Sequence, residues 1–269
     1  MFQTIEHRFC QFSYCIGGHG PPVLMIQGAG MHGDGWLPQF EGLADQFRCL
    51  RFDNRGMGKS QPIGAPLTIE QMAEDARVLM DAAGWESAHV VGHSMGGLIA
   101  QHLAISKPSR VRSLALLCTF ARGTEATGLR TDMFWLGMRT FIGTRRMRRR
   151  AFLEMVFPRD YLRRVDRDAL AEQLAPLFGH DLADHPPVMR QQLAAISRYD
   201  ASAHLHQLAS VRTLVVSARH DPIARPSAGK AIAAGIPGSR YVEFPDASHG
   251  APIQFAKEMN HLLRQHFSG

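Results

Sequence analysis

The segment GHSMGG at positions 92–97 places a hydroxyl group between glycines, directly after the apolar residues Val90 and Val91. The match to G-x-S-x-G, between an apolar run and a stretch with helical spacing, predicts a tight turn that lifts the Ser94 hydroxyl clear of a sheet. Glycines are needed at positions 92 and 96 because a Cβ there would clash with the neighbouring strand and helix. A plain glycine turn that contains serine is the alternative.

Serine needs a base and an acid to become a nucleophile. Asp221 follows the apolar run at 211–218, and His249 follows the run at 240–244. In hydrolases whose nucleophilic serine lies on a turn between a strand and a helix, the acid and then the histidine follow the serine along the chain. Ser94, Asp221 and His249 have this order. We expect His249 to take the serine proton and Asp221 to orient the imidazole. Asp246 is a second candidate acid, whereas His93 and His220 are expected to point away from the site.

Two backbone N–H groups should face the developing oxyanion. One belongs to Met95, which follows the serine, and the other should lie in the loop Gln27-Gly28-Ala29-Gly30, where Ala29 is the expected donor. Residues 28–33 also fit G-x-G-x-x-G, with Asp53 about 20 residues further on, which is a dinucleotide-binding pattern. The complete set of Ser, Asp and His elsewhere favours the oxyanion loop. We therefore expect no cofactor, and no metal-ligand spacing is evident.

These residues must be positioned by a layered fold. Apolar runs at 23–27, 48–53, 87–93, 111–118, 211–218 and 240–244 predict strands, and residues 4–16 predict an antiparallel hairpin. Helical spacing at 36–47, 68–84, 94–107, 225–235 and 252–267 alternates with them. The sequence thus predicts an α/β protein with a mostly parallel, doubly wound, eight-stranded sheet. Strand signals stop between 122 and 207, so we expect a core of residues 1–121 and 208–269 with a helical cap, residues 122–207, inserted after the sixth strand.

Composition narrows the class of protein. The chain has 269 residues, of which 45% are hydrophobic and 20% charged, with no apolar run of bilayer length, no signal-like start and four scattered cysteines. A cytoplasmic protein is expected. The net charge of +6 includes the basic run 145–150, but Met147, Phe152 and Met155 interleave with it as on an amphipathic helix. We expect no nucleic-acid partner and no membrane span, and the sequence leaves monomer and homo-oligomer open.

The motifs together resemble the α/β-hydrolase fold family. The resemblance rests on QGAG at 27–30, DNRGMGKS at 53–60, GHSMGG at 92–97, RHDPIA at 219–224 and DASHG at 246–250. The family usually has His-Gly where this chain has Gln27-Gly28, which puts in doubt the hydrogen bonds that order the oxyanion loop. Ser94 argues against the dehalogenase and epoxide hydrolase branches, which use aspartate at this position. The stretches 68–85, 92–104 and 193–216 are similar to 3-oxoadipate enol-lactonases and related small carboxylesterases.

The expected function is hydrolysis of a small-molecule carboxylic ester or lactone through an acyl-enzyme on Ser94. A C–C bond hydrolase, or a cofactor-free perhydrolase or haloperoxidase, would use the same three residues, and a non-catalytic ligand receptor is the alternative from another class. Large apolar residues of the cap mostly pack it onto the core. Cap residues that line the substrate pocket would favour an apolar acyl group. The candidates for the pocket are Gly28 of the oxyanion loop and Trp135, Met138 and Phe141 of the cap. An anionic lactone would instead require an arginine of the cap.

Overall fold

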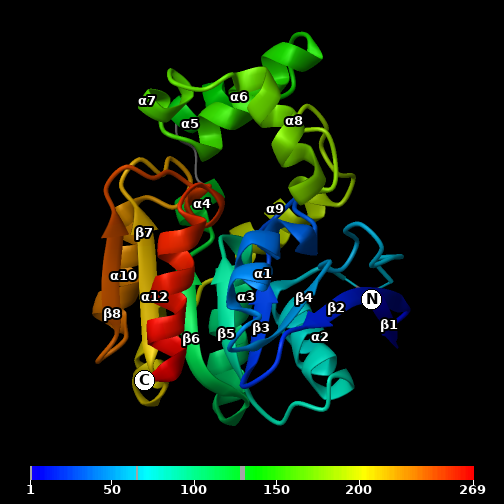
Figure 1. Cartoon of the computed structure of the whole chain (residues 1–269), viewed down its shortest axis with the longest axis vertical. Helices are drawn as coiled ribbons and strands as arrows, with labels where there is room; N and C mark the ends of the chain where they lie inside the picture. The colour runs from blue at the N-terminus through cyan, green and yellow to red at the C-terminus, as the bar shows by residue number, and fades with distance from the viewer. Residues whose placement is uncertain (1, 65, 128–130) are drawn as a thin grey trace.

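The computed structural model describes residues 2–64, 66–127 and 131–269, and it places the backbone but not the side chains of 127 and 131–134. Within the described residues the chain forms an eight-stranded sheet in the order β1-β2-β4-β3-β5-β6-β7-β8 (Figure 1). Strands β1 and β2 form an antiparallel hairpin, β2 pairs antiparallel with β4, and the other pairs are parallel. The strands are β1 (Phe2–His7), β2 (Cys10–Gly17), β3 (Pro22–Ile26), β4 (Arg48–Phe52), β5 (Ala88–His93), β6 (Val111–Leu117), β7 (Thr213–Ala218) and β8 (Arg240–Phe244).

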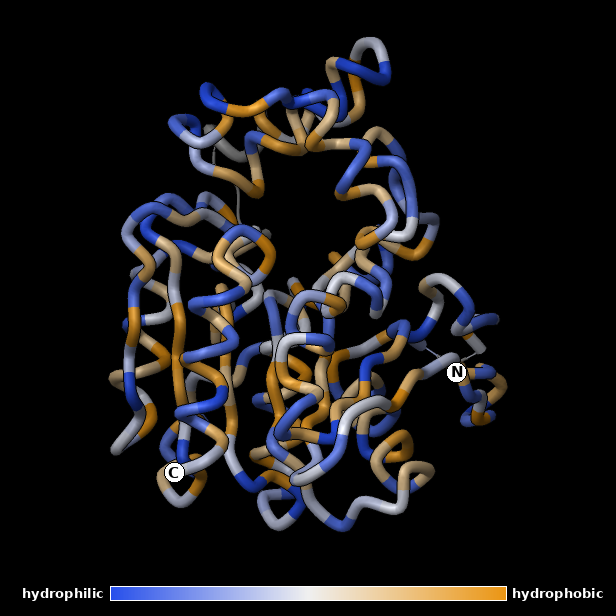
Figure 2. Tube along the Cα trace, viewed as in Figure 1, coloured by the Kyte–Doolittle hydropathy of each residue, from blue (hydrophilic) through white to orange (hydrophobic). Residues whose placement is uncertain are grey.

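The strand assignments follow from burial on both faces. All residues of β5 and β7 are buried, and four of the five in β3, so these strands are continuous apolar runs rather than alternating ones. Figure 2 shows this as hydrophobic strands at the centre of the lower part of the molecule. The predicted fold class, a mostly parallel α/β sheet of the α/β-hydrolase type, is confirmed.

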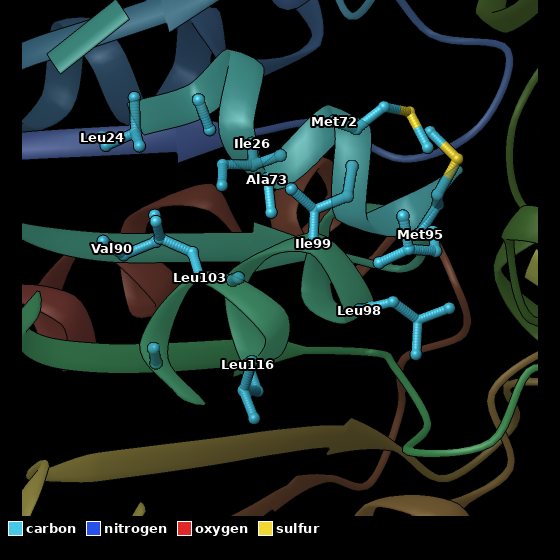
Figure 3. Close-up of a cluster of buried hydrophobic side chains, with 14 of the residues drawn as sticks. Leu24, Ile26, Met72, Ala73, Val90, Met95, Leu98, Ile99, Leu103 and Leu116 are labelled. Carbon is cyan, nitrogen blue, oxygen red and sulfur yellow. The ribbon is translucent and has the colours of Figure 1, made fainter. Parts of the chain in front are cut away.

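Helices cover the two faces of the sheet. On one face pack α1 (Leu37–Leu43) and α12 (Ala256–Ser268), and on the other α2 (Ile69–Ala82), α3 (Met95–Ser106) and α10 (Pro226–Gly235). Figure 3 shows the second layer, where Leu24 of β3, Val90 of β5 and Leu116 of β6 lie against side chains of α2 and α3. This packing fixes the start of α3, and with it Ser94, relative to the carboxyl ends of the strands.

The remaining helices of the core are short. They are η1 (Gly33–Trp36), η2 (Pro108–Arg110) and α11 (Ala251–Gln254), and a longer 3₁₀ helix, η3 (Ser202–Ser210), leads from the inserted helices to β7. The helix expected at 36–47 is therefore η1 followed by α1, and the last expected helix is divided at Phe255, whose backbone (φ −116°, ψ 44°) is not helical. Helix α2 begins as expected, because the Thr68 side chain accepts a hydrogen bond from the Gln71 N–H at 3.1 Å.

Between β6 and β7 the chain forms a layer of helices above the carboxyl ends of the strands (Figure 1). We call residues 122–207 the cap segment. Its helices are α4 (Thr124–Thr127), α5 (Thr131–Arg139), α6 (Arg145–Val156), α7 (Arg159–Leu162), α8 (Arg167–Phe178) and α9 (Met189–Arg198). A hydrophobic cluster of α6, α7 and α8 also takes in Met31 and Ile253 from below, so the cap segment packs onto the loops after β3 and β8.

Four of the five arginines in the basic run of α6 form ion pairs within the cap segment. Arg146 and Arg150 lie 2.6 and 3.0 Å from Asp168, and Arg145 and Arg149 pair with Asp181. Hydrogen bonds from Arg146 and Arg150 lower the pKa of Asp168 to about 2. Exposed pairs of this kind contribute little to stability, but they give four of the arginines a counter-charge within the protein. No helix of the described chain is both long and apolar enough to cross a bilayer.

Candidate active site

Ser94 lies at the sharp turn between β5 and α3. Its backbone is in a sparsely populated region (φ 54°, ψ −120°) for a residue with a side chain. A Cβ on Gly92 would lie 2.2 Å from the Gly96 oxygen, and a Cβ on Gly96 would lie 2.1 Å from the Ile26 oxygen. Both contacts are far inside van der Waals distance. The glycines are thus the steric condition for the turn, as the spacing predicts.

Asp221 and His249 meet beside Ser94. The Nδ1 atom of His249 lies 2.8 Å from Oδ2 of Asp221, and the other carboxylate oxygen accepts hydrogen bonds from the N–H groups of Ile223 (2.8 Å) and Ala224 (2.9 Å). The Asp221 side chain is fully buried, and a carboxylate can only accept, so Nδ1 of His249 carries the proton and Nε2 is left as the basic atom. Asp246, the rival acid, is exposed to solvent.

Ser94 and His249 line the same cavity. No hydrogen bond joins the serine hydroxyl to the imidazole among the contacts of the described residues. In enzymes without substrate such bonds are commonly long or poorly aligned and tighten in the complex. The arrangement therefore brings together the three residues that the sequence singled out.

The expected oxyanion donors flank Ser94. The N–H groups of Ala29 and Met95 donate to no protein acceptor among the described hydrogen bonds, and Ala29 lines the cavity. Gly28 approaches closely, because a Cβ built on it would lie 3.1 Å from the Cβ of Ser94. Its own N–H is taken by the side-chain oxygen of Gln27 at 2.8 Å. The two available amides are those of Ala29 and Met95.

Gln27 and Asn54 order this loop in place of the usual histidine. Asn54 donates through Nδ2 to the backbone oxygen of Gln27 at 2.8 Å. The DNRGMGKS segment thereby supports the loop from the core. Within it, Arg55 makes a buried two-point pair with Asp75, with Nε to Oδ2 at 2.8 Å and Nη2 to Oδ1 at 2.6 Å.

His93 does not point away from the site, contrary to expectation. Its Nε2 donates to the backbone oxygen of His249 at 2.9 Å, and its Nδ1 lies 3.2 Å from Oε1 of Gln27. Complete burial, followed by the charge of His249, lowers the pKa of His93 to about 3, so the ring is neutral. The expectation for His93 assumed that neighbouring side chains alternate in direction, as along a strand. His93 is the last residue of β5 and Ser94 is in the sharp turn, so the alternation does not continue between them. His220 is exposed, as expected.

The three glycine amides of the pattern at 28–33 are already bonded within the protein, with the Gly28 N–H donating to Gln27 as described above. The Gly30 N–H donates to Gln192 and the Gly33 N–H to Asp53, both at 2.8 Å. The glycine N–H groups that a dinucleotide loop would turn toward a phosphate are thus used within the protein, and so is the Asp53 carboxylate. Among the described residues no group of three or more His, Cys, Asp or Glu could hold a metal ion.

The cavity above Ser94 has a volume of about 290 Å³. Among the residues that the structure describes, its lining includes no Asp, Glu, Lys or Arg. Its apolar walls come from the cap segment and from the loops after β3, β6 and β8. They include Met31, Phe120, Phe152, Met155, Val156, Phe178, Met189, Leu193, Ile196, Pro252 and Ile253.

Two of the four residues expected in the pocket reach it. Gly28 and Phe141 line the cavity, whereas Trp135 and Met138 do not and are 68% and 37% exposed. The reason lies at the end of α5. Thr140 and Phe141 follow the helix in a turn that borders the cavity, whereas Trp135 and Met138 lie on α5 at positions rotated from Gly137, which also lines the cavity. The apolar spacing of Phe152, Met155 and Val156 was the signal that could have found the wall formed by α6.

A family model described as alpha/beta hydrolase fold matches residues 21–256. The chain belongs to this family. This α/β-hydrolase is 32% identical to a putative carbamate hydrolase, RutD, of Azorhizobium caulinodans over 93% of its own length and 92% of that protein. It is 29% identical to the putative non-heme bromoperoxidase BpoC of Mycobacterium tuberculosis, covering 95% of this chain and 97% of that protein. The enol-lactonase structure from Burkholderia xenovorans LB400 superposes with a TM-score of 0.80 at 29% identity over 97% of each chain.

Proposed function

We propose that this α/β-hydrolase cleaves an uncharged, mainly apolar carboxylic ester or lactone through an acyl-enzyme on Ser94. The observation that carries the proposal is the convergence of Ser94 and the Asp221–His249 pair on one apolar cavity. The names of relatives, which include an enol-lactonase and a putative carbamate hydrolase, support attack on an acyl carbon. The cap of residues 122–207 closes the cavity in this proposal.

The proposed steps follow the positions of the groups. The Ser94 hydroxyl attacks the carbonyl carbon while Nε2 of His249 takes its proton. The negative charge on the former carbonyl oxygen is stabilised by the N–H groups of Ala29 and Met95 and by the amino end of α3. His249 then protonates the leaving oxygen as its bond to carbon breaks. Water, deprotonated by His249, attacks the acyl-enzyme and releases the acid and the free serine.

The cavity favours neutral substrates. A substrate carboxylate held there would meet a mainly apolar wall without an arginine or lysine from the described lining, in which the cap segment contributes Thr140 and His185 as polar side chains. Leaving a charged group buried and unpaired costs on the order of 3 kcal/mol or more, which is about 100-fold in kcat/KM. This argues against an anionic lactone such as a dicarboxylic enol-lactone, and against a dienoate whose C–C bond is hydrolysed. Cofactor-free perhydrolysis and a non-catalytic receptor remain as alternatives for the test.

Labelling with a fluorophosphonate probe tests the nucleophile. The wild-type protein should be labelled, Ser94→Ala should not, and Asp221→Asn should react about 10⁴-fold more slowly because the imidazole tautomer is no longer held. An intact protein that resists the probe would contradict the proposal and leave the receptor alternative.

A matched pair of substrates tests the specificity. The p-nitrophenyl ester of hexanoic acid and the mono-p-nitrophenyl ester of adipic acid have the same chain length and differ by a terminal carboxylate. We expect kcat/KM to favour the neutral ester by about 100-fold. Equal rates, or a preference for the charged ester, would show that a cation reaches the pocket. Three further assays test the alternatives. They measure hydrolysis of a carbamate, hydrolysis of a dienoate, and formation of peracid from acetate and peroxide.

A further inference from the structure

On the amino side of Ala29, the loop is held by contacts from the core. Asn54 binds the Gln27 oxygen, and the Gln27 side chain binds the Gly28 N–H, both at 2.8 Å. These two backbone groups belong to the same peptide unit, which is therefore fixed. The next unit contains the Gly28 carbonyl and the Ala29 N–H, and it is the unit that points the candidate donor toward the oxyanion.

The other end of the loop is held by the cap segment. The Gly30 N–H donates to Oε1 of Gln192 on α9 at 2.8 Å, and Nε2 of His180, which follows α8, lies 2.9 Å from the Gly30 oxygen. Because a carbonyl oxygen only accepts, His180 donates to Gly30 in the tautomer that carries its proton on Nε2; its Nδ1 lies 2.8 Å from the Asp181 oxygen. These contacts fix the peptide units on both sides of the Gly30 Cα. The partners are 162 and 150 residues away along the chain.

Packing supports the same attachment. Gln192 is fully buried, and a Cβ on Gly30 would lie 2.1 Å from Cε of Met189, so α9 lies directly against the loop. Met31 is part of the hydrophobic cluster of the cap segment, and the His32 N–H donates to the Phe178 oxygen at 3.3 Å. Gly30 itself has a left-handed backbone (φ 71°) that glycine adopts without strain but does not hold without contacts.

We propose that Gln192, assisted by His180, is a positioning residue that holds the Ala29 N–H in the orientation that stabilises the oxyanion. The inference rests on the proposed function. The Ala29 peptide unit lies between an anchor from the core and an anchor from the cap segment, and two glycines beside it would otherwise leave it free to rotate. A donor that is already aligned stabilises the transition state without reorganisation. The cap segment is thereby part of the oxyanion site as well as a wall of the cavity.

The test compares three substitutions on α9. Gln192→Met keeps the length of the side chain and removes the acceptor, Gln192→Glu keeps an acceptor oxygen, and Gln191→Met changes an exposed neighbour of the same type. We expect Gln192→Met to lower kcat about 10- to 100-fold with little change in KM, because a shift near 1 Å at a reacting group can cost about 100-fold. Gln192→Glu should recover most of the loss, and Gln191→Met should match the wild-type protein.

A second measurement separates positioning from a loss of folding. A trifluoromethyl ketone forms a tetrahedral oxyanion with the serine, whereas the methyl ketone of the same chain length binds without forming one. Gln192→Met should weaken inhibition by the trifluoromethyl ketone about 10-fold or more and leave the methyl ketone unchanged. Equal kcat and equal inhibitor ratios for Gln192→Met and Gln191→Met would overturn the inference. Failure of the wild-type protein to hydrolyse esters would instead overturn the proposed function.

Discussion

Gly96→Ala offers a quantitative test of the turn that carries Ser94. The new Cβ would lie 2.1 Å from the Ile26 oxygen, whereas carbon–oxygen contacts of this kind are at least about 3.3 Å. The start of α3 must therefore move about 1.2 Å away from the end of β3. Ile26 directly precedes the oxyanion loop, so this movement separates the N–H of Met95 from that of Ala29.

A displacement of this size should lower kcat about 100-fold. Overpacking should also reduce the free energy of unfolding by roughly 1–3 kcal/mol. The assays are kcat on the hexanoate ester, the rate of fluorophosphonate labelling and thermal unfolding. Gly84→Ala is the matched control, because Gly84 has a left-handed backbone (φ 72°) with open space around its Cβ position, far from the cavity.

The control should lose about 1 kcal/mol of stability without losing activity. If Gly96→Ala kept kcat within twofold of the wild-type value, the steric account of the turn would be refuted. If both variants lost activity in proportion to stability, the loss would reflect unfolding rather than the geometry of the site.

Two further predictions concern stability. Asp75→Asn leaves the buried Arg55 guanidinium without its counter-charge, so it should lower the free energy of unfolding by about 3–5 kcal/mol and Tm by roughly 10 °C. Asp160→Asn removes an exposed ion pair and should change Tm little. Equal shifts of Tm in the two variants would contradict the argument. Burial, then the charge of Arg212, lowers the pKa of His266 to about 4 in the folded protein, so the unfolded chain binds the extra proton as pH falls below about 6.5. The free energy of unfolding should therefore fall by about 2 kcal/mol from this residue between pH 7.5 and 5, and denaturant titrations of His266→Gln should show a smaller fall than the wild-type protein.

The sequence by itself determined the parts of the protein that depend on neighbouring residues. The strained turn at Ser94 follows from the glycines around it, and apolar runs buried between helices identify the strands. In a parallel sheet, loops that follow successive strands emerge at one edge. The order of motifs was therefore enough to expect Ser94, Asp221 and His249 on one side of the sheet.

Only the tertiary structure decided which side chains meet across long separations. Apolar spacing predicts a helix in the cap segment but neither its rotation nor the path of the turn after it, so Trp135 on α5 does not reach the cavity and Phe141 in the following turn does. The contact of Gln192 with Gly30 joins residues 162 positions apart and leaves no local pattern in either segment. Local sterics can be read from a few consecutive residues, whereas the packing of the cap segment depends on the shape of the whole surface beneath it.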